Sequence, residues 1–349
     1  MKKIVLTGGG TAGHIIPNIA LIPYFSPHFE IYYLGDENGM EFELIKNFKN
    51  VQFVGIKSVK FVRKFTFKNL LIPFKLMKYI SKAKKILKEE IKPDILFAKG
   101  GYISLPVVFA AKSLKIPILA HESDYSFGLA NTIILKKCNI MFTSFRETCI
   151  NDKCIFTGSP IRDIIFNGKK DIARKTCNFS HRLPIIMIFG GSSGSRRINE
   201  FVWKNLNNLN EVNIIHIVGK GNLTNNQKNN YFQTEFINNI YDFFDLADIV
   251  ICRAGSNSIF ELLALKKLMI LIPLAKQSRG EQVDNANVFQ NNGYAKVILE
   301  QDLNIQSLKR MIKHSLENRE KIQNIMSNYK PMNTNRIILD YALKYSEKS

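Results

Sequence analysis

The sequence predicts an α/β protein with two similar domains, and three observations carry this prediction. Short apolar, β-branched runs alternate with longer amphipathic stretches along the whole chain, as strands and helices do around a parallel sheet. The length of 349 residues suits two domains of ordinary size. A glycine-rich turn follows the first predicted strand of each half. We therefore expect two domains, each built around its own parallel sheet.

The first predicted domain covers residues 1–162. Its apolar runs predict strands at 4–7, 31–34, 94–98, 116–120 and 140–143, with helical patterns between them. From 163 to 183 the chain becomes polar and basic without clear periodicity, so we expect a linker there.

The second predicted domain covers residues 184–332. Pro184 opens a strand at 185–189, and further buried strands are predicted at 214–218, 249–252 and 268–272. The final segment, 333–349, carries one apolar stripe at helical spacing, formed by Ile337, Ile338, Tyr341, Ala342 and Tyr345. We expect this last helix to dock on another part of the molecule.

Composition limits the possible functions. The formal net charge of +20 favours nucleic acid, an anionic membrane or phosphorylated ligands as partners. The five cysteines are scattered without paired C-x-x-C spacing, which is typical of a protein from a reducing cytoplasm. No apolar run approaches the ~18 residues of a membrane span.

The first glycine turn, Gly8 to His14, contains the spacing G-x-G-x-x-G and leads into a helix predicted at 15–25 with Pro17 in its first turn. Such glycines let a backbone approach a ligand, and the start of a helix attracts anions. Two alternatives stay open at this stage. The turn could be a tight connection without a ligand, or it could hold a nicotinamide cofactor with Asp36 or Glu37 on the ribose.

Two more turns of this kind lie in the second half. Residues 190–197 follow the strand at 185–189, with Ser192 expected at the start of a helix that continues from about Ile198. Residues 253–258 follow the strand at 249–252 and lead into a helix that contains Glu261. Ser256 or Ser258 could simply cap this helix. A nicotinamide enzyme would leave these two turns unexplained.

Taken in order, the motifs resemble those of one family, the MurG glycosyltransferases. They are GGGTAGHIIPNIAL (8–21), KGGYISLP (99–106), HESDYSFGLAN (121–131), GSPIR (158–162), GGSSGSRRIN (190–199), EFI (235–237), ICRAGSNSIFELLAL (251–265) and EQVDNAN (281–287). The resemblance spans nearly the whole chain. It departs from many members at Ala12, usually glycine, at Ser159, usually asparagine, and at Asp124, where a sugar-contacting asparagine often stands.

The resemblance implies a GT-B fold, in which two Rossmann-like domains face each other across a cleft and the last helix returns to the N-terminal domain. It also implies an inverting transfer of N-acetylglucosamine from its UDP derivative to the C4 hydroxyl of undecaprenyl-linked N-acetylmuramyl pentapeptide, a step of peptidoglycan synthesis that serves cell shape and division. The alternative within the same fold is a glycosyltransferase with another lipid acceptor, such as diacylglycerol. The segment 121–131 argues against it, because acceptor differences should lie in the N-terminal domain.

The resemblance also assigns site residues. On the side of the UDP-sugar they are Thr11, Ala12, Gly13, Asp124, Arg162, Ser192, Ile237, Ser256, Asn257, Ser258, Ile259, Phe260, Glu261 and Gln282, and on the acceptor side Tyr102 and Asn131. A carboxylate at Glu261 suits both ribose hydroxyls. His14, aimed outward by its turn, is the first candidate for the general base, and Glu122 is the rival base.

Neither a metal nor a cofactor is expected. No D-x-D pair lies near the glycine turns, so helix dipoles and Arg162 should stabilise the diphosphate instead. No helix-turn-helix, zinc or RNP pattern supports nucleic-acid binding.

Half of the excess positive charge lies between Lys57 and Lys92, where twelve basic residues accompany two acidic ones. Phe61, Val62, Phe65 and Phe67 interleave with Lys60, Arg63, Lys64 and Lys68. An ordinary amphipathic helix, with one solvated face and one face in the core, would explain the segment that follows. It explains these four interleaved apolar residues less well. We therefore expect this segment to bind an anionic membrane surface, with the enzyme peripheral on the cytoplasmic face.

Overall fold

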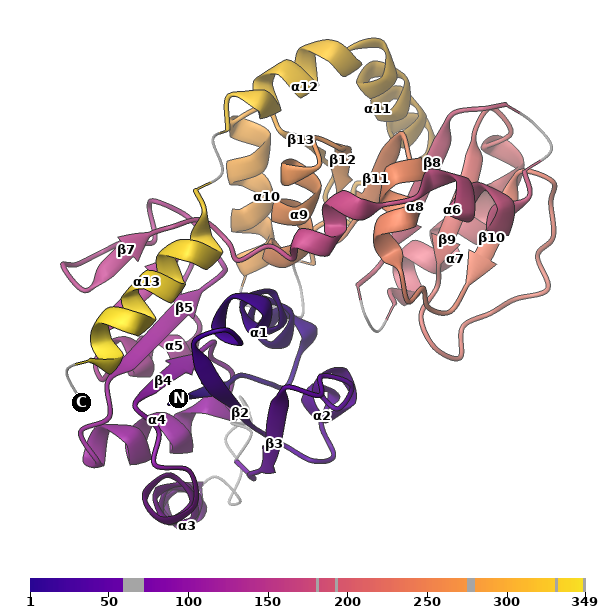
Figure 1. The fold of residues 1–349 in the computed structure, drawn as a ribbon. Coiled ribbons are helices and arrows are strands. Elements are labelled where there is room, and N and C mark those ends of the chain that lie inside the picture. Colours follow the sequence, from indigo (N-terminus) through magenta and orange to yellow (C-terminus); the bar gives the residue numbers. More distant parts are fainter. Residues whose placement is uncertain (59–71, 180–181, 192–193, 275–279, 330–331, 348–349) are drawn as a thin grey trace. The chain divides into compact units, whose positions relative to one another are not determined.

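The computed structural model describes residues 1–58, 72–179, 182–191, 194–274, 280–329 and 332–347. The chain divides into two compact units: Met1–Arg162 with Pro331–Ser349, and Asp163–Lys330. Both units are α/β structures with a parallel sheet (Figure 1).

The sheet of the first unit has the strand order β3-β2-β1-β4-β5-β6-β7, and all of its neighbouring strands are parallel. Its strands are β1 (Lys2–Thr7), β2 (Phe29–Gly35), β3 (Val51–Gly55), β4 (Ile95–Ala98), β5 (Ile118–Glu122), β6 (Ile140–Thr143) and β7 (Cys154–Phe156). The short strands β3 and β7 lie at the two edges and were not predicted, because neither has a long apolar run.

Helices cover both faces of this sheet. Alternate residues of a strand point to opposite faces, so Ile4 and Leu6 share one core with α1 (Ala12–Phe25) and α2 (Met40–Ile45), whereas Val5 lies in the other core. That other core is closed by α3 (Ile72–Lys85), the π-helix Ile86–Ile91, α4 (Ser104–Ser113) and α5 (Leu129–Leu135). Burial on both faces explains why these strands are apolar runs rather than alternating patterns.

The last helix, α13 (Thr334–Ser346), packs beside α1 on the first unit (Figure 1). Ile338, Leu339 and Ala342 are buried in the same core as Ile4, and the ring of Tyr341 meets that of Phe142 at 5.4 Å between centroids. The apolar stripe thus has a docking surface within the unit that contains β1.

The sheet of the second unit has the order β10-β9-β8-β11-β12-β13 and is also parallel. Its strands are β8 (Ile185–Phe189), β9 (Asn213–Ile217), β10 (Tyr231–Thr234), β11 (Ile249–Cys252), β12 (Leu268–Leu271) and β13 (Ala295–Val297). Its helices are α6 (Lys170–Cys177), α7 (Arg196–Asn205), α8 (Ile240–Leu246), α9 (Ser256–Ala264), α10 (Glu281–Asn291), α11 (Ile305–Glu317) and α12 (Arg319–Ser327), with a short 3-10 turn at Leu206–Asn208.

Three local details differ from the sequence expectations. Helix α1 begins at Ala12, so Pro17 lies in its second turn rather than its first. Helix α7 begins at Arg196, with Ser195 as its N-cap, two residues earlier than expected. The segment expected to be a linker contains the 3-10 helix Asp163–Asn167 and α6, and the backbone amide of Lys169 donates to Asp242 Oδ1 at 2.8 Å.

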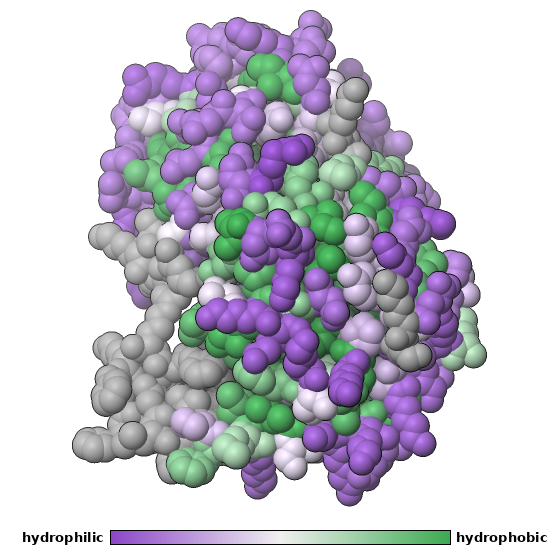
Figure 2. Space-filling view, turned by 90° about the vertical axis from the view of Figure 1, so that its left-hand side faces the viewer, coloured by the Kyte–Doolittle hydropathy of each residue, from purple (hydrophilic) through white to green (hydrophobic). Residues whose placement is uncertain are grey.

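Apolar side chains reach the surface at several places. On the face shown in Figure 2, hydrophobic residues form separate groups between hydrophilic ones. On α3, Phe74 and Met77 are 72% and 68% exposed, and the lysines Lys75 and Lys78 beside them are exposed as well. Within the described part of the chain, no helix is long and apolar enough to span a membrane.

Candidate functional site

The glycine turns of both units lie where the strand order reverses. In the first unit β1 and β4 are neighbours, with Thr7 opposite Ala98, so residues 8–14 and 99–102 leave the same edge of the sheet side by side. In the second unit β8 and β11 are neighbours, with Phe189 opposite Cys252, which brings residues 190–191 and 194–195 beside 253–255. The crevice outside the carboxyl ends of strands at such a reversal is the usual ligand site of an open α/β sheet.

The first turn is closely packed. Gly10 adopts a φ of +85°, and a Cβ there would lie 2.7 Å from Tyr102 Cε1. Gly101, with a φ of +78°, lies against the carbonyl of Gly9 and would place a Cβ 3.2 Å from His14 Nδ1. The two turns therefore contact each other, and this contact brings His14 and Tyr102 to one place.

His14 lies in the first turn of α1 and is half-buried. Its Nδ1 is 3.1 Å from Thr11 Oγ1, and its backbone amide donates to the carbonyl of Thr11 at 3.1 Å. Thr11 and Gly13 are exposed, and Ala12 is half-buried. The hydroxyl of Thr11 thus orients the imidazole at the exposed end of the turn.

A buried carboxylate that the sequence analysis missed supports this turn from below. Glu41 is fully buried and accepts hydrogen bonds from the backbone amides of Gly10, at 3.3 Å, and Asp36, at 3.0 Å. The hydroxyl of Tyr33 donates to the carbonyl of Gly8 at 2.6 Å, and burial raises its pKa. These contacts give the turn one conformation.

Buried charges lie under the neighbouring turn. Lys99 is 1% exposed, and its ammonium donates to Ser123 Oγ at 2.6 Å and to the carbonyl of His121 at 3.3 Å. Burial lowers the pKa of Lys99 to about 8, although Glu122 and Asp124 act in the opposite direction. Burial likewise raises the pKa of Glu122, an effect to which Asp124 adds and which Lys99 opposes.

Glu122, the rival base, has both carboxylate oxygens engaged. Oε1 accepts from the amide of Asp124 at 3.0 Å, and Oε2 accepts from the amide of Gly128 at 3.0 Å and from Asn131 Nδ2 at 2.9 Å. Asn131 Oδ1 is buried with no hydrogen-bond partner among the described residues and lies against Gly100. The structure therefore brings Glu122, Asp124 and Asn131 together where β5 leads into α5, beside the second turn of this unit.

Arg162 ends a segment that is held at the same edge of the sheet. His121 Nε2 lies 3.1 Å from the carbonyl of Gly158, whose φ of +81° turns the chain there. Helix α13 holds the end of the segment, because Asn335 Nδ2 donates to the carbonyl of Ile161 at 2.8 Å. The last helix thus positions the residue next to Arg162.

In the second unit an arginine joins the two turns. Arg253 is buried, and its Nη2 donates to Ser195 Oγ at 2.7 Å and forms an ion pair with Glu300 at 2.5 Å. Ser195 Oγ also accepts from the amide of Ile198 at 3.4 Å as the N-cap of α7. Ser192, the residue expected at this helix start, lies outside the described residues.

Helix α9 begins after Gly255, which is its N-cap, so neither Ser256 nor Ser258 occupies the capping position. Ser256, Ile259, Phe260 and Glu261 are buried, and Asn257 and Ser258 are half-buried. The ring of Phe260 packs edge-on against that of Phe289, with 5.3 Å between the ring centroids.

Helix α10 supports the same turn. Asn285 is fully buried, and its Nδ2 donates to the carbonyl of Ala254 at 3.1 Å. Gln282 Oε1 accepts from the amide of Leu274 at 3.1 Å.

Ile237, which follows β10, is half-buried. Glu235, two residues before Ile237, accepts a hydrogen bond from the backbone amide of Gly221 at 2.6 Å.

Some glycines at these turns are closely packed and others are not: a Cβ at Gly190 or Gly194 would lie 2.3 Å from Ser195 Cβ or 2.2 Å from the carbonyl oxygen of Val218. A Cβ at Gly191, Gly255 or Gly280 would meet none of the described atoms within 4 Å. Gly255 and Gly280 are the N-caps of α9 and α10, and backbone amides at a helix start are suited to an anion such as a diphosphate.

The structure thus places most of the described predicted residues in two groups, one at the reversal point of each sheet. Ile237 and Arg162 follow the outer strands β10 and β7, and Ser192 lies outside the described residues. Sequence reasoning missed the three buried charges Glu41, Lys99 and Arg253. Lys99 and Arg253 stand inside the quoted motifs, and a charged residue directly after a buried strand was the signal that could have identified them. Among the described residues, no cluster of three or more histidine, cysteine, aspartate or glutamate side chains is placed to hold a metal ion.

Comparison with known proteins assigns the family. The model of the glycosyltransferase family 28 N-terminal domain matches residues 4–143, and that of the family 28 C-terminal domain matches residues 185–338. Among solved structures, Acinetobacter baumannii MurG superposes with a TM-score of 0.75 at 23% identity and covers 99% of this chain and 100% of its own. The calicheamicin glycosyltransferase CalG4 superposes with a TM-score of 0.71 at 11% identity, with coverages of 99% and 98%. At these identities the two structures establish the GT-B fold alone.

Curated relatives are more similar in sequence. A Clostridium botulinum protein (strain Alaska E43) is 46% identical and a Clostridium perfringens protein (strain SM101) 48% identical, each over 98% of both chains. Both are named UDP-N-acetylglucosamine–N-acetylmuramyl-(pentapeptide) pyrophosphoryl-undecaprenol N-acetylglucosamine transferase. The chain is therefore a glycosyltransferase of family 28 and belongs to the MurG family, as its motifs predicted.

Proposed function

We propose that this protein transfers N-acetylglucosamine from its UDP derivative to the C4 hydroxyl of undecaprenyl-linked N-acetylmuramyl pentapeptide, with inversion at the sugar carbon. The observation that carries the proposal is the match of 46–48% identity over 98% of chains that bear this name. The two groups of polar residues at the sheet reversal points suit a reaction with two substrates.

The second unit is the proposed donor site. Gly255 directly precedes α9, and the positive potential of this helix start suits the diphosphate of UDP and the charge that develops as it leaves. Glu261, buried one turn further along α9, is the proposed acceptor of the ribose hydroxyl hydrogen bonds. Arg253 and Asn285 hold the turn in place from behind. Arg162 is proposed to contact a phosphate of the substrate.

The first unit supplies the proposed general base. With Nδ1–H donating to Thr11 Oγ1, the imidazole of His14 presents the lone pair of Nε2 to the acceptor hydroxyl. Glu122 is a positioning residue in this proposal, because its oxygens already accept three hydrogen bonds within the loop of Asn131. Tyr102 and Asn131 are proposed to contact the acceptor. The reaction needs no bound metal in this scheme.

A donor and acceptor panel tests the reaction. Purified protein is incubated with UDP-N-acetylglucosamine, UDP-glucose or UDP-galactose and with a lipid-linked muramyl pentapeptide analogue or diacylglycerol. We expect turnover only with UDP-N-acetylglucosamine and the muramyl acceptor. If the protein glycosylates diacylglycerol and does not use the muramyl acceptor, the proposal is contradicted and the alternative lipid acceptor is favoured.

We further propose that the segment from Lys57 to Lys92 binds an anionic membrane surface and keeps the protein peripheral on the cytoplasmic face. Residues 59–71, with the aromatic cluster around Phe61 and Phe65, lie outside the described residues. Helix α3 supports the proposal, because Phe74 and Met77 are exposed beside Lys75 and Lys78 rather than packed in a core. Burying such apolar side chains yields ~1.5–3 kcal/mol each, and anionic lipid adds ~1 kcal/mol per nearby lysine.

Co-sedimentation with phosphatidylglycerol vesicles tests this surface. We expect Phe74→Ser with Met77→Ser, and separately Lys75→Glu with Lys78→Glu, to reduce vesicle binding severalfold. Turnover of a short-chain soluble acceptor should be retained. Lys309→Glu with Lys313→Glu on α11 is the matched charge control. Unchanged binding in both α3 variants would place the membrane contact elsewhere.

A further inference from the structure

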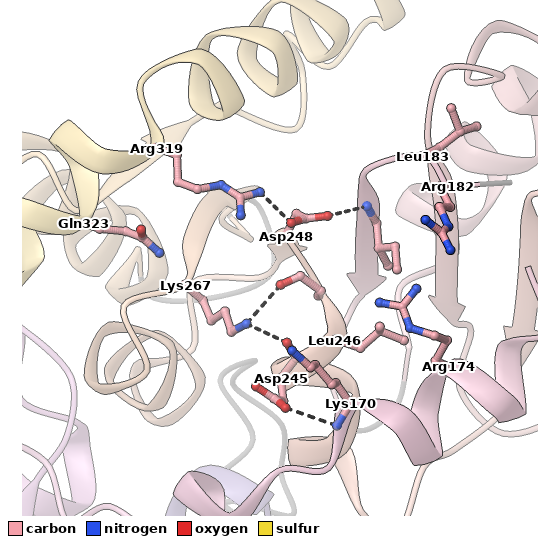
Figure 3. Close-up of a pocket in the computed structure, with 12 residues that line it drawn as sticks. Lys170, Arg174, Arg182, Leu183, Asp245, Leu246, Asp248, Lys267, Arg319 and Gln323 are labelled. Atoms are coloured by element: carbon pink, nitrogen blue, oxygen red, sulfur yellow. Dashed lines mark hydrogen bonds and ion pairs between the residues drawn. The ribbon is translucent and has the colours of Figure 1, made fainter.

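A cavity of about 660 Å³ lies in the second unit at the amino ends of its strands (Figure 3). Ile185 begins β8, Asp248 directly precedes β11 and Lys267 directly precedes β12, and all three line the cavity. The open glycine turns follow the carboxyl ends of β8 and β11. A strand of five residues separates the two edges of the sheet by roughly 15 Å, so the cavity is separate from the proposed donor site.

Positive charge dominates the lining. Five of the lining side chains are cationic and two are carboxylates; they are Lys170, Arg174, Arg182, Lys267 and Arg319, and Asp245 and Asp248. The remaining walls include Leu183, Leu246 and Ala247. A concave site with this imbalance attracts anions more strongly than the same charges on a convex surface.

Both carboxylates are engaged in the framework of the cavity. Asp248 Oδ1 pairs with Arg319 at 2.5 Å, and its Oδ2 accepts from the amide of Ile185 at 2.8 Å. Asp245 Oδ2 accepts from the amide of Lys170 at 3.1 Å. These carboxylates hold the strand and helix ends, and two carboxylates neutralise only part of the charge of five cations.

Two guanidinium groups face each other across one side of the cavity. Arg174 comes from α6 and Arg182 from the segment before β8, and Figure 3 shows their guanidinium groups pointing toward one another. Opposite them, Lys267 Nζ donates to the carbonyls of Asp245 at 3.0 Å and Ala247 at 3.1 Å. Burial lowers the pKa of Lys267, an effect that Asp245 and Asp248 oppose and to which the charges of Arg319 and Lys170 add. The two carboxylates thus offset the repulsion that Lys267 meets from its cationic neighbours.

We propose that this cavity binds a soluble molecule that carries two or more phosphate groups. Guanidinium groups bind phosphate oxygens in bidentate geometry, so one phosphate fits between Arg174 and Arg182, and a second fits toward Lys170 and Lys267. The volume is within the range of ordinary ligand pockets, and the walls at Leu183 and Leu246 offer apolar contact to the uncharged part of such a molecule.

Calorimetric titration of the full-length protein with inorganic pyrophosphate tests the proposal. The titration is made at constant ionic strength and with saturating UDP, which occupies the proposed donor site. We expect one pyrophosphate to bind, with Arg174→Gln plus Arg182→Gln raising its Kd at least tenfold. Arg310→Gln plus Lys313→Gln, two exposed cations of α11, should change the Kd less than twofold.

Three results would overturn the proposal. In the first, the unmodified protein does not bind pyrophosphate. In the second, both pairs of substitutions raise the Kd for pyrophosphate equally. In the third, the Arg174/Arg182 variant loses UDP binding together with pyrophosphate binding. A lipid headgroup offers the same phosphate chemistry, so vesicles of phosphatidylglycerol form the second arm. Loss of vesicle binding in the Arg174/Arg182 variant without pyrophosphate binding by the unmodified protein would assign the cavity to lipid instead. Because both arginines are exposed, a thermal unfolding curve suffices to show that the variant is folded.

Discussion

The two units place glycine turns at the same topological position but surround them differently. In the first unit a Cβ at Gly10 would lie 2.7 Å from Tyr102, and Gly101 lies against the carbonyl of Gly9. In the second unit a Cβ at Gly191 or Gly255 would meet no described atom within 4 Å. Gly10 and Gly101 thus serve the packing of the protein itself, whereas no described atom closes on Gly191 or Gly255. Gly190 and Gly194 of the second unit are as closely packed as the first pair, because a Cβ there would lie 2.3 Å from Ser195 Cβ and 2.2 Å from the carbonyl oxygen of Val218.

The charges beneath the turns differ in a related way. In the first unit the buried charges Lys99 and Glu122 bind polar groups of the neighbouring segment. Lys99 donates to Ser123 Oγ, and Glu122 accepts from the amide of Gly128. In the second unit one side chain connects the two turns, because Arg253 donates a hydrogen bond to Ser195 Oγ while it also pairs with Glu300. The same arrangement of strands therefore supports a rigid platform in one unit, which we propose to carry the catalytic side chains, and a proposed anion site in the other.

The largest expected effect comes from the rigid platform. His14→Ala should lower kcat by ~10²–10⁴ and leave UDP affinity nearly unchanged, because the imidazole acts on the acceptor hydroxyl and not on the nucleotide. Steady-state kinetics and a UDP titration measure both quantities. An equal loss of UDP binding would make His14 a structural residue.

Glu122→Gln distinguishes the rival base in the same assay. The amide retains an oxygen for the loop, so we expect a smaller loss of kcat than for His14→Ala. A loss of the same size, with the acidic limb of the pH profile removed, would assign the base to Glu122 instead.

The next effect concerns the open site. Glu261→Ala should lower kcat/KM by ~2–4 kcal/mol, because the ribose hydroxyl groups lose a buried hydrogen-bond acceptor. Glu200→Ala on α7, whose side chain is 54% exposed, is the matched control and should have no effect. Unchanged kinetics for Glu261→Ala would remove this residue from the donor site.

These contrasts were only partly predictable from the sequence. The long buried strands and the three turns could be located because apolar runs and glycines are local signals. The edge strand β3 could not be located, because it depends on pairing with β2. The N-cap Ser195 could not be identified either, because the sequence does not show at which residue the helix begins. The role of Arg253 as a bridge to Ser195 depends on the neighbouring positions of β8 and β11, which are 60 residues apart in sequence and adjacent only in the folded sheet.

Two glycine substitutions test the packing contrast directly. Gly101→Ala should destabilise the protein by about 2–3 kcal/mol, because its φ of +78° disfavours a side chain and a Cβ would overlap the carbonyl oxygen of Gly9. Gly255→Ala should change stability by less than about 1 kcal/mol, since its φ is −70° and the space is open, but should raise the KM for the donor. Urea unfolding and donor kinetics separate these effects. Equal destabilisation by both substitutions would refute the contrast.

The smallest expected effect concerns a buried histidine of the second unit. The ring nitrogens of His216 lie 3.0 Å from the hydroxyl of Tyr231 and 3.1 Å from Asn199 Oδ1, and burial lowers its pKa from 6.5 to about 4. A histidine with a lowered pKa in the folded state gives its full stabilisation above about pH 6.5 and loses it as the pH falls toward 4.

Between pH 7 and pH 5 the second unit should therefore lose about 2 kcal/mol of unfolding free energy through this residue. Trp203 is the one tryptophan of the chain and donates to Tyr231 at 3.0 Å, so its fluorescence in urea reports unfolding next to His216. His216→Asn should be less stable at both pH values, since Tyr231 and Asn199 lose a partner, but its unfolding free energy should fall less on acidification. The exposed residue His314 of the same unit is the control, and His314→Asn should keep the pH dependence of the unmodified protein. An identical pH dependence in His216→Asn would mean that other groups carry the acid sensitivity of this unit.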